Sequence, residues 1–135
     1  MSLLVNTGSL YVWKNDRRTL DTTIKSGDKA FSPTWDMVIK YKGKKMSEEE
    51  YIKQYISLMK TSFINHGERW GELLLQDEVI LACYCPPGTD FCHRYLLAQI
   101  LCYLGARRGY ELLGGKAALT MEIPFFLDRD VMMDW

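Results

Sequence analysis

The sequence lacks a long apolar run, a net charge and a set of cysteines spread along the chain. No run approaches the roughly 20 apolar residues that span a bilayer, so no membrane-spanning helix is expected. The 17 basic and 17 acidic side chains cancel, which argues against a strong overall field for nucleic acid or a membrane surface. The four cysteines are bunched between positions 83 and 102, unlike the disulfide framework of a secreted domain. We therefore expect a cytoplasmic protein.

Common phosphate-binding and nucleophile motifs are also missing. The sequence contains no G-x-x-x-x-G-K-[ST], no G-x-G-x-x-G and no G-x-S-x-G. The phosphatase loop, in which a cysteine precedes an arginine at a fixed spacing, is absent as well. Eight residues separate Cys85 from Arg94, and one separates Cys92 from Arg94. Any anion site here must therefore be built differently.

Charge is uneven along the chain. Residues 1–45 hold nine Lys/Arg and four Asp/Glu, a local excess that leaves room for a basic patch. Its centre would be the lysines that follow the first long helix, Lys40, Lys42, Lys44 and Lys45. The alternative interpretation is a solvated helix end and turn.

The 135 residues, 47% hydrophobic and 25% charged, suit one domain over 1–135 with a real core. The alternation of strand and helix patterns predicts a compact three-layer α/β domain with a mixed, partly parallel sheet. Residues 116–135 are expected to dock on it as a C-terminal extension. The expected strands are Leu3–Val12, Leu20–Ile24, 79–84, Tyr110–Leu113 and Ala117–Ile123; the expected helices begin at Ser32-Pro33, at Ser47 with Glu50 as a capping box, at Glu68 and at Phe91.

The most informative segment is Leu81–Ala98, LACYCPPGTDFCHRYLLA. An apolar strand ends at a Pro-Pro-Gly breaker, and Asp90 then caps a helix whose first turn carries Cys92, His93 and Arg94. In open α/β sheets, ligands bind beyond the carboxyl ends of the strands. The free amides of a helix N-terminus favour anions there. The segment therefore predicts an anion site.

Each residue of this turn suits a defined role. The helix dipole and Arg94 would favour the Cys92 thiolate, and His93 would serve as a general acid or base. The planar fork of Arg94 suits phosphate or carboxylate. Each also has a plain structural interpretation: Cys83 and Cys92 as buried small side chains, and Arg94 paired with a carboxylate.

Two other uses of the cysteines stay open at this point. Cys83, Cys85, Cys92 and His93 are metal-ligand types, but a C-x-C pair within a strand matches structural zinc sites poorly. A redox pair of Cys85 with Cys92 is the second alternative. We expect no metal and no cofactor.

Three separated motifs resemble the domain-of-unknown-function 488 (DUF488) family, in its phage and bacterial branch, over roughly residues 3–115. They are Cys83 with Cys92-His93-Arg94, the stretch 21–36, and the stretch 44–51. Cys85 departs from the charged residues typical of that family, so the resemblance gives it no role. The resemblance implies a small Rossmann-like fold and a link to nucleotides or nucleic acid.

The resemblance adds Lys25 and Asp36 to the site. Lys25 would supply a charge facing phosphate, and Asp36 would orient His93 or pair with Arg94. The leading hypothesis is an anion-binding pocket for a small phosphorylated ligand such as a nucleotide. Cys92 and His93 would be catalytic, with Arg94, Cys83, Lys25 and Asp36 binding the ligand. The rivals are a binding module without turnover and a thiol-redox or metal protein.

Overall fold

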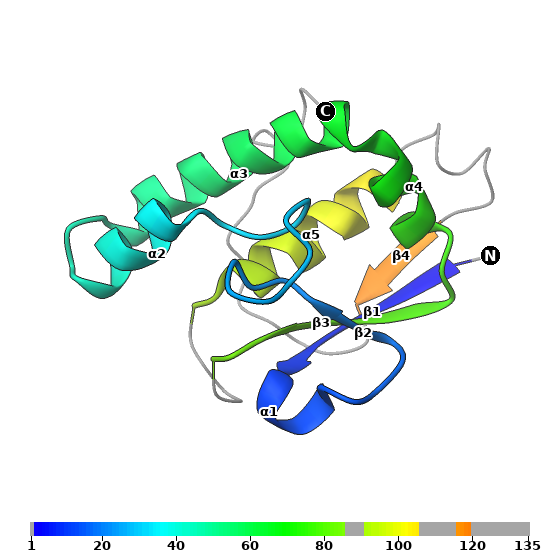
Figure 1. Cartoon of the computed structure of the whole chain (residues 1–135). Helices are drawn as coiled ribbons and strands as arrows, with labels where there is room; N and C mark the ends of the chain where they lie inside the picture. Colours follow the sequence, from blue (N-terminus) through cyan, green and yellow to red (C-terminus); the bar gives the residue numbers. More distant parts are fainter. Residues whose placement is uncertain (1, 86–90, 106–115, 120–135) are drawn as a thin grey trace.

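The computed structural model describes residues 2–85, 91–105 and 116–119 (Figure 1). The expected Asp90 cap, the strand at Tyr110–Leu113 and most of the C-terminal extension lie outside the described residues. Among the described residues, no helix is both long and apolar enough to cross a membrane.

Four strands form one sheet in the order β2-β3-β1-β4. They are β1 (Ser2–Ser9), β2 (Thr19–Asp21), β3 (Glu78–Cys83) and β4 (Lys116–Leu119). All three pairings are parallel. The predicted α/β class is confirmed, and the sheet, predicted to be partly parallel, is parallel throughout the described strands. The register sets Ser9 opposite Cys83 and Asp21 opposite Ala82. The carboxyl ends of β1, β2 and β3 therefore meet at one edge.

Five helices are described: α1 (Leu10–Trp13), α2 (Trp35–Lys42), α3 (Glu48–Asn65), α4 (Gly67–Leu74) and α5 (His93–Gly105). Helix α5 packs against β1, β3 and β4, and α3 packs against α2, α4 and α5. Figure 1 shows α5 between the sheet and α3. This arrangement places the N-terminus of α5 beside the end of β3.

Helix starts were predicted with mixed success. Ser47 caps α3 as expected, because its Oγ accepts the Glu50 amide at 3.1 Å. The start of α2 at Ser32-Pro33 was wrong: Thr34 is the cap, its Oγ1 accepting the Met37 amide at 3.2 Å. Ser32 is instead buried, so its hydroxyl does not serve the helix end. The first strand also ends early, because Ser9 caps α1.

The main core lies where α3 and α4 meet α5 and the sheet. Tyr55 and Met59 of α3 and Trp70 of α4 are fully buried, so both helices turn an apolar face to the core. The Tyr55 hydroxyl donates to the Phe31 carbonyl at 2.7 Å. The buried polar groups of this core are thus anchored to backbone, and the core holds the sheet and α5 in fixed relation.

Candidate functional site

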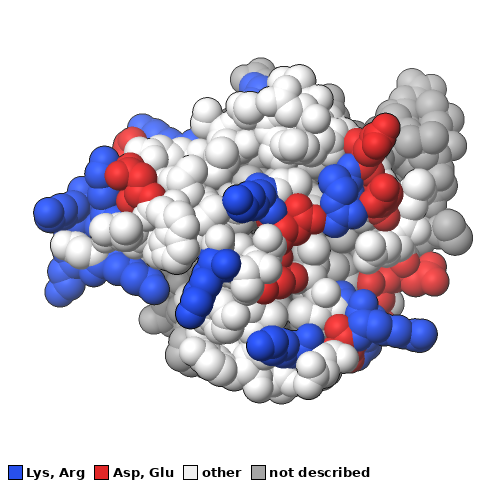
Figure 2. Space-filling view, viewed as in Figure 1, with Lys and Arg blue, Asp and Glu red and all other residues white. Residues whose placement is uncertain are grey.

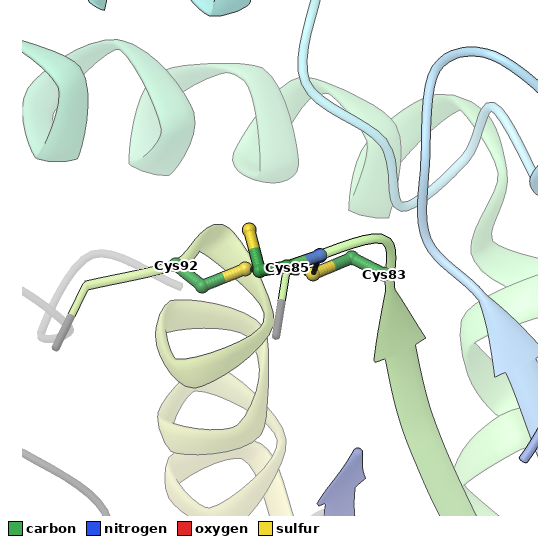
Figure 3. Close-up of side chains that lie close together, drawn as sticks. All are labelled: Cys83, Cys85 and Cys92. Carbon is green, nitrogen blue, oxygen red and sulfur yellow. Dashed lines mark hydrogen bonds between the residues drawn. The ribbon is translucent and has the colours of Figure 1, made fainter. Parts of the chain in front are cut away.

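Three cysteine side chains converge where β3 ends and α5 begins. Figure 3 shows Cys83 at the tip of β3, Cys92 just before α5, and Cys85 between them. Their three sulfur atoms all lie within 4.8 Å of one another, and the sulfurs of Cys83 and Cys92 are 3.0 Å apart. Cys83 and Cys92 are buried, whereas Cys85 is partly exposed.

Local backbone structure explains this convergence. Cys83 is the last residue of β3, and the Cys85 amide turns back to donate to the Cys83 sulfur at 3.4 Å. The Cys92 carbonyl accepts the Tyr95 amide at 3.0 Å and so closes the first turn of α5. The cysteines at the end of β3 and just before α5 therefore have their sulfur atoms close together.

Arg94 brings a positive charge into this sulfur cluster. Its side chain is only 2% exposed. Its Nη1 donates to the Cys83 sulfur at 3.0 Å and to the Cys85 carbonyl at 3.2 Å, and its Nη2 donates to the Tyr95 hydroxyl at 3.3 Å. A guanidinium in this position stabilises negative charge on sulfur.

The cluster favours one shared thiolate. Hydrogen bonds from the Cys83 and Cys92 thiols, together with the charge of Arg94, lower the pKa of Cys85. The pKa values of Cys83 and Cys92 are raised, chiefly because the sulfurs hydrogen-bond to one another and a second thiolate beside the first is disfavoured. These pKa directions favour the thiolate form of Cys85, the partly exposed sulfur of the cluster, while Arg94 itself donates to the Cys83 sulfur. This favours Cys85 as the reactive thiol, where the sequence had favoured Cys92.

His93 is held as a neutral side chain. Its Nε2 lies 2.9 Å from both the carbonyl and the hydroxyl oxygen of Thr22. The Thr22 hydroxyl itself donates to the Ala82 carbonyl at 2.9 Å, so Nε2 must carry the proton. Nδ1 then has its lone pair on the side of the Cys92 sulfur, 3.8 Å away. Burial lowers the pKa of His93 to about 4.

The two residues added from the family resemblance lie at the surface. Lys25 is exposed, with its Nζ 5.8 Å from the centre of the Tyr84 ring, so it stands near the chain between Cys83 and Cys85. Asp36 is not brought to the site. It pairs with Lys40 at 3.1 Å with a carboxylate 66% exposed, and Thr22 takes the orienting role expected of it.

Sequence reasoning missed Thr22 and Tyr95. Thr22 follows a short strand in the segment that carries the family resemblance, and this was the available signal. Tyr95 follows Arg94 directly, and its ring lies 5.1 Å from the guanidinium carbon. No spacing pattern distinguishes such a tyrosine from a core residue.

The expected basic patch gathers around the end of α2. Lys42, Lys44 and Lys45 line an open hollow of about 620 Å³ with Tyr41, Met46 and Ser47. Figure 2 shows basic side chains gathered at the end of the molecule that carries α2. Lys40, in contrast, is neutralised by Asp36.

Comparison with known families gives a match over most of the chain. The model of the active DUF488-N3 subclade, DUF488-N3a, matches residues 9–105. The chain belongs to the DUF488 family. The matched span includes all three cysteines of the cluster, together with His93 and Arg94. No curated protein and no solved structure matches this DUF488 chain.

Proposed function

We propose that this DUF488 protein is a cysteine-dependent enzyme that acts on a small anionic, phosphorylated ligand. The observation that carries the proposal is the convergence of three sulfurs within 4.8 Å on a buried arginine that donates to one of them. Buried charge and sulfur in such proximity cost stability and have no packing benefit. Clusters of this kind concentrate at functional sites.

Cys85 is the nucleophile of this proposal. It is the partly exposed member of the cluster, so an incoming ligand reaches it before Cys83 or Cys92. Its sulfur would form a bond to an electrophilic atom of the ligand, whose leaving group departs with the bonding electron pair. Water would then cleave the new bond, releasing the hydroxylated product, a proton and the Cys85 thiolate.

The basic side chains supply the preference for an anion. Arg94 lowers the pKa of Cys85 through its charge, while its Nη1 donates to the Cys83 sulfur. Exposed Lys25 lies near the ring of Tyr84, the residue before Cys85 in the chain. His93 remains neutral, and its Nδ1 lies 3.8 Å from the Cys92 sulfur, so the ring adds no positive charge that would favour a thiolate on Cys92. A nucleotide is the ligand class expected from the family.

Alkylation of the reduced protein by iodoacetamide tests this proposal. Mass spectrometry should find Cys85 modified at least about tenfold faster than Cys102, whose pKa burial raises to about 11. ATP and pyrophosphate should slow the modification of Cys85 alone. Equal rates at the two cysteines would contradict a reactive Cys85. Protection by ATP without turnover of any nucleotide would indicate a binding module instead.

A reversible disulfide is the second candidate, favoured by the 3.0 Å separation of the Cys83 and Cys92 sulfurs. Oxidised glutathione would supply the oxidant: two successive exchanges would form the Cys83–Cys92 bond and release two reduced glutathione molecules. Peptide mapping after incubation with oxidised glutathione would detect the cross-link. If only mixed disulfides at Cys85 appear, the redox function is wrong and the nucleophilic one stands.

A further inference from the structure

We infer that the sulfurs of Cys83, Cys85 and Cys92, together with Nδ1 of His93, form a binding site for a soft divalent cation of the zinc class. Thiolate and imidazole ligands select such cations. The inference does not depend on catalysis by Cys85. A metal and an electrophile would compete for the same sulfur.

The separations of the sulfurs fit a single ion. With metal–sulfur bonds of about 2.3 Å, two ligands of a tetrahedral site lie about 3.8 Å apart. All three sulfurs are within 4.8 Å of one another. The closest pair, Cys83 and Cys92, is 3.0 Å apart, so it must open by less than about 1 Å to admit an ion. Rotation about side-chain bonds is enough for such a shift.

His93 has the arrangement typical of a metal ligand. Ligating histidines generally donate their second ring N–H to a carbonyl or carboxylate, which fixes the ring and leaves the other nitrogen for the metal. Here Nε2 donates to Thr22 at 2.9 Å, and Nδ1 lies 3.8 Å from the Cys92 sulfur. A tetrahedral site requires a sulfur–nitrogen separation of about 3.6 Å. His93 is the fourth ligand in this inference. Its Nδ1 lies near the Cys92 sulfur but outside the group of atoms within 4.8 Å of one another, so the other sulfurs must move toward it when an ion binds.

Arg94 balances the charge of the occupied site. Three thiolates and one divalent cation leave a net charge of about −1, which is costly in a buried position unless it is paired. Arg94 is buried and already donates to the Cys83 sulfur at 3.0 Å. Arg94 would therefore neutralise the remaining negative charge from outside the coordination sphere, through its bond to the Cys83 sulfur.

Titration of the reduced, metal-free full chain with Co²⁺ and Cd²⁺ tests the inference. We expect one ion per chain and intense sulfur-to-metal charge-transfer absorption, together with tetrahedral d–d bands for Co²⁺. Cys92→Ser and Cys83→Ser should each reduce the absorption and weaken binding at least about tenfold, while Cys102→Ser should leave both unchanged. Arg94→Met should weaken binding by about tenfold and Arg94→Lys by less.

Several outcomes would overturn the metal site. They are the absence of charge-transfer absorption at equimolar Cd²⁺, binding that survives Cys92→Ser and Cys83→Ser in folded protein, and equal loss in Cys102→Ser. Circular dichroism confirms that each variant is folded. If no metal binds but Cys85 is alkylated fast, only the metal site fails. If Cd²⁺ binds while metal-free Cys85 reacts no faster than Cys102, only the nucleophile fails.

Discussion

Two buried regions of this protein hold polar side chains, and they use them differently. In the core around α3, polar atoms lead back to main-chain carbonyls: Tyr55 donates to Phe31, and Trp70 donates to Ser62, which donates to Ala30. The bonds to Phe31 and Ala30 tie α3 to the loop before α2, and the Trp70–Ser62 bond ties α4 to α3. Polar groups satisfied in this way fix one packing arrangement.

At the end of β3, functional side chains contact one another. The Cys83 sulfur meets Cys92 and Arg94, and His93 faces the Cys92 sulfur. Contacts of this kind change with protonation, oxidation or metal binding, whereas a hydroxyl bonded to a carbonyl does not. The comparison therefore separates a region whose polar contacts fix the packing from one whose contacts can change with the chemical state of the side chains.

Loss of a core aromatic side chain should have the largest effect on stability. Trp70 is completely buried, and its ring packs edge-on to Phe31 at 4.9 Å. Trp70→Ala should lower the free energy of unfolding by about 3–5 kcal/mol, measured by urea denaturation. Trp35→Ala is the matched control, because Trp35 is 53% exposed and should cost less than about 0.5 kcal/mol. Slow alkylation of Cys85 in the folded Trp70 variant would contradict the separation of the two regions.

Substitution of Thr22 should affect both the stability of the protein and the state of His93. Thr22 is fully buried and bonds both Ala82 and His93, so Thr22→Val should cost about 1–3 kcal/mol in denaturation. Ring ¹⁵N NMR should show the proton of His93 on Nε2 in the native protein and in Thr22→Ser. A mixture of tautomers is expected in Thr22→Val. An unchanged spectrum in that variant would mean that the Thr22 carbonyl alone fixes the ring.

Removal of the most accessible sulfur of the cluster should abolish fast alkylation and leave stability almost unchanged, the reverse of what is expected for Trp70→Ala. Cys85 is only partly buried, so Cys85→Ser should change the free energy of unfolding by about 1 kcal/mol or less. It should nevertheless remove the fast phase of iodoacetamide modification completely. Persistence of a fast phase in this variant would place the reactive thiolate on Cys83 or Cys92.

The fold was more predictable from sequence than the site. Ser47 with Glu50 predicted the start of α3 because capping is a local property. The strand ending at Cys83 and the helix carrying Arg94 followed from local breakers in the same way. Choosing Thr34 over Ser32 as a cap depended on the burial of Ser32, which no local pattern reveals.

Side-chain partners across the sheet could not be predicted. The C-x-C pair of Cys83 and Cys85 matches structural zinc sites poorly. The third sulfur belongs to Cys92, just before α5, and its approach across the loop is not visible in the spacing. Placing Thr22 against His93 required the pairing of β2 with β3, which sets partners 71 residues apart. Spacing within one segment carries no information about such contacts.

Substitution of Asp36 should have the smallest effect on stability, and it tests whether α2 influences the cluster at the end of β3. The family resemblance predicted that Asp36 would orient His93 or pair with Arg94, but it pairs with Lys40 on α2. Exposed i, i+4 pairs contribute little, so Asp36→Asn should cost about 0.5 kcal/mol or less and should weaken at high salt. The ring ¹⁵N spectrum of His93 and the alkylation rate of Cys85 should match those of the native protein. A shift in either would mean that the Asp36 carboxylate acts on the site at a distance, and α2 would then have to be grouped with the cluster at the end of β3.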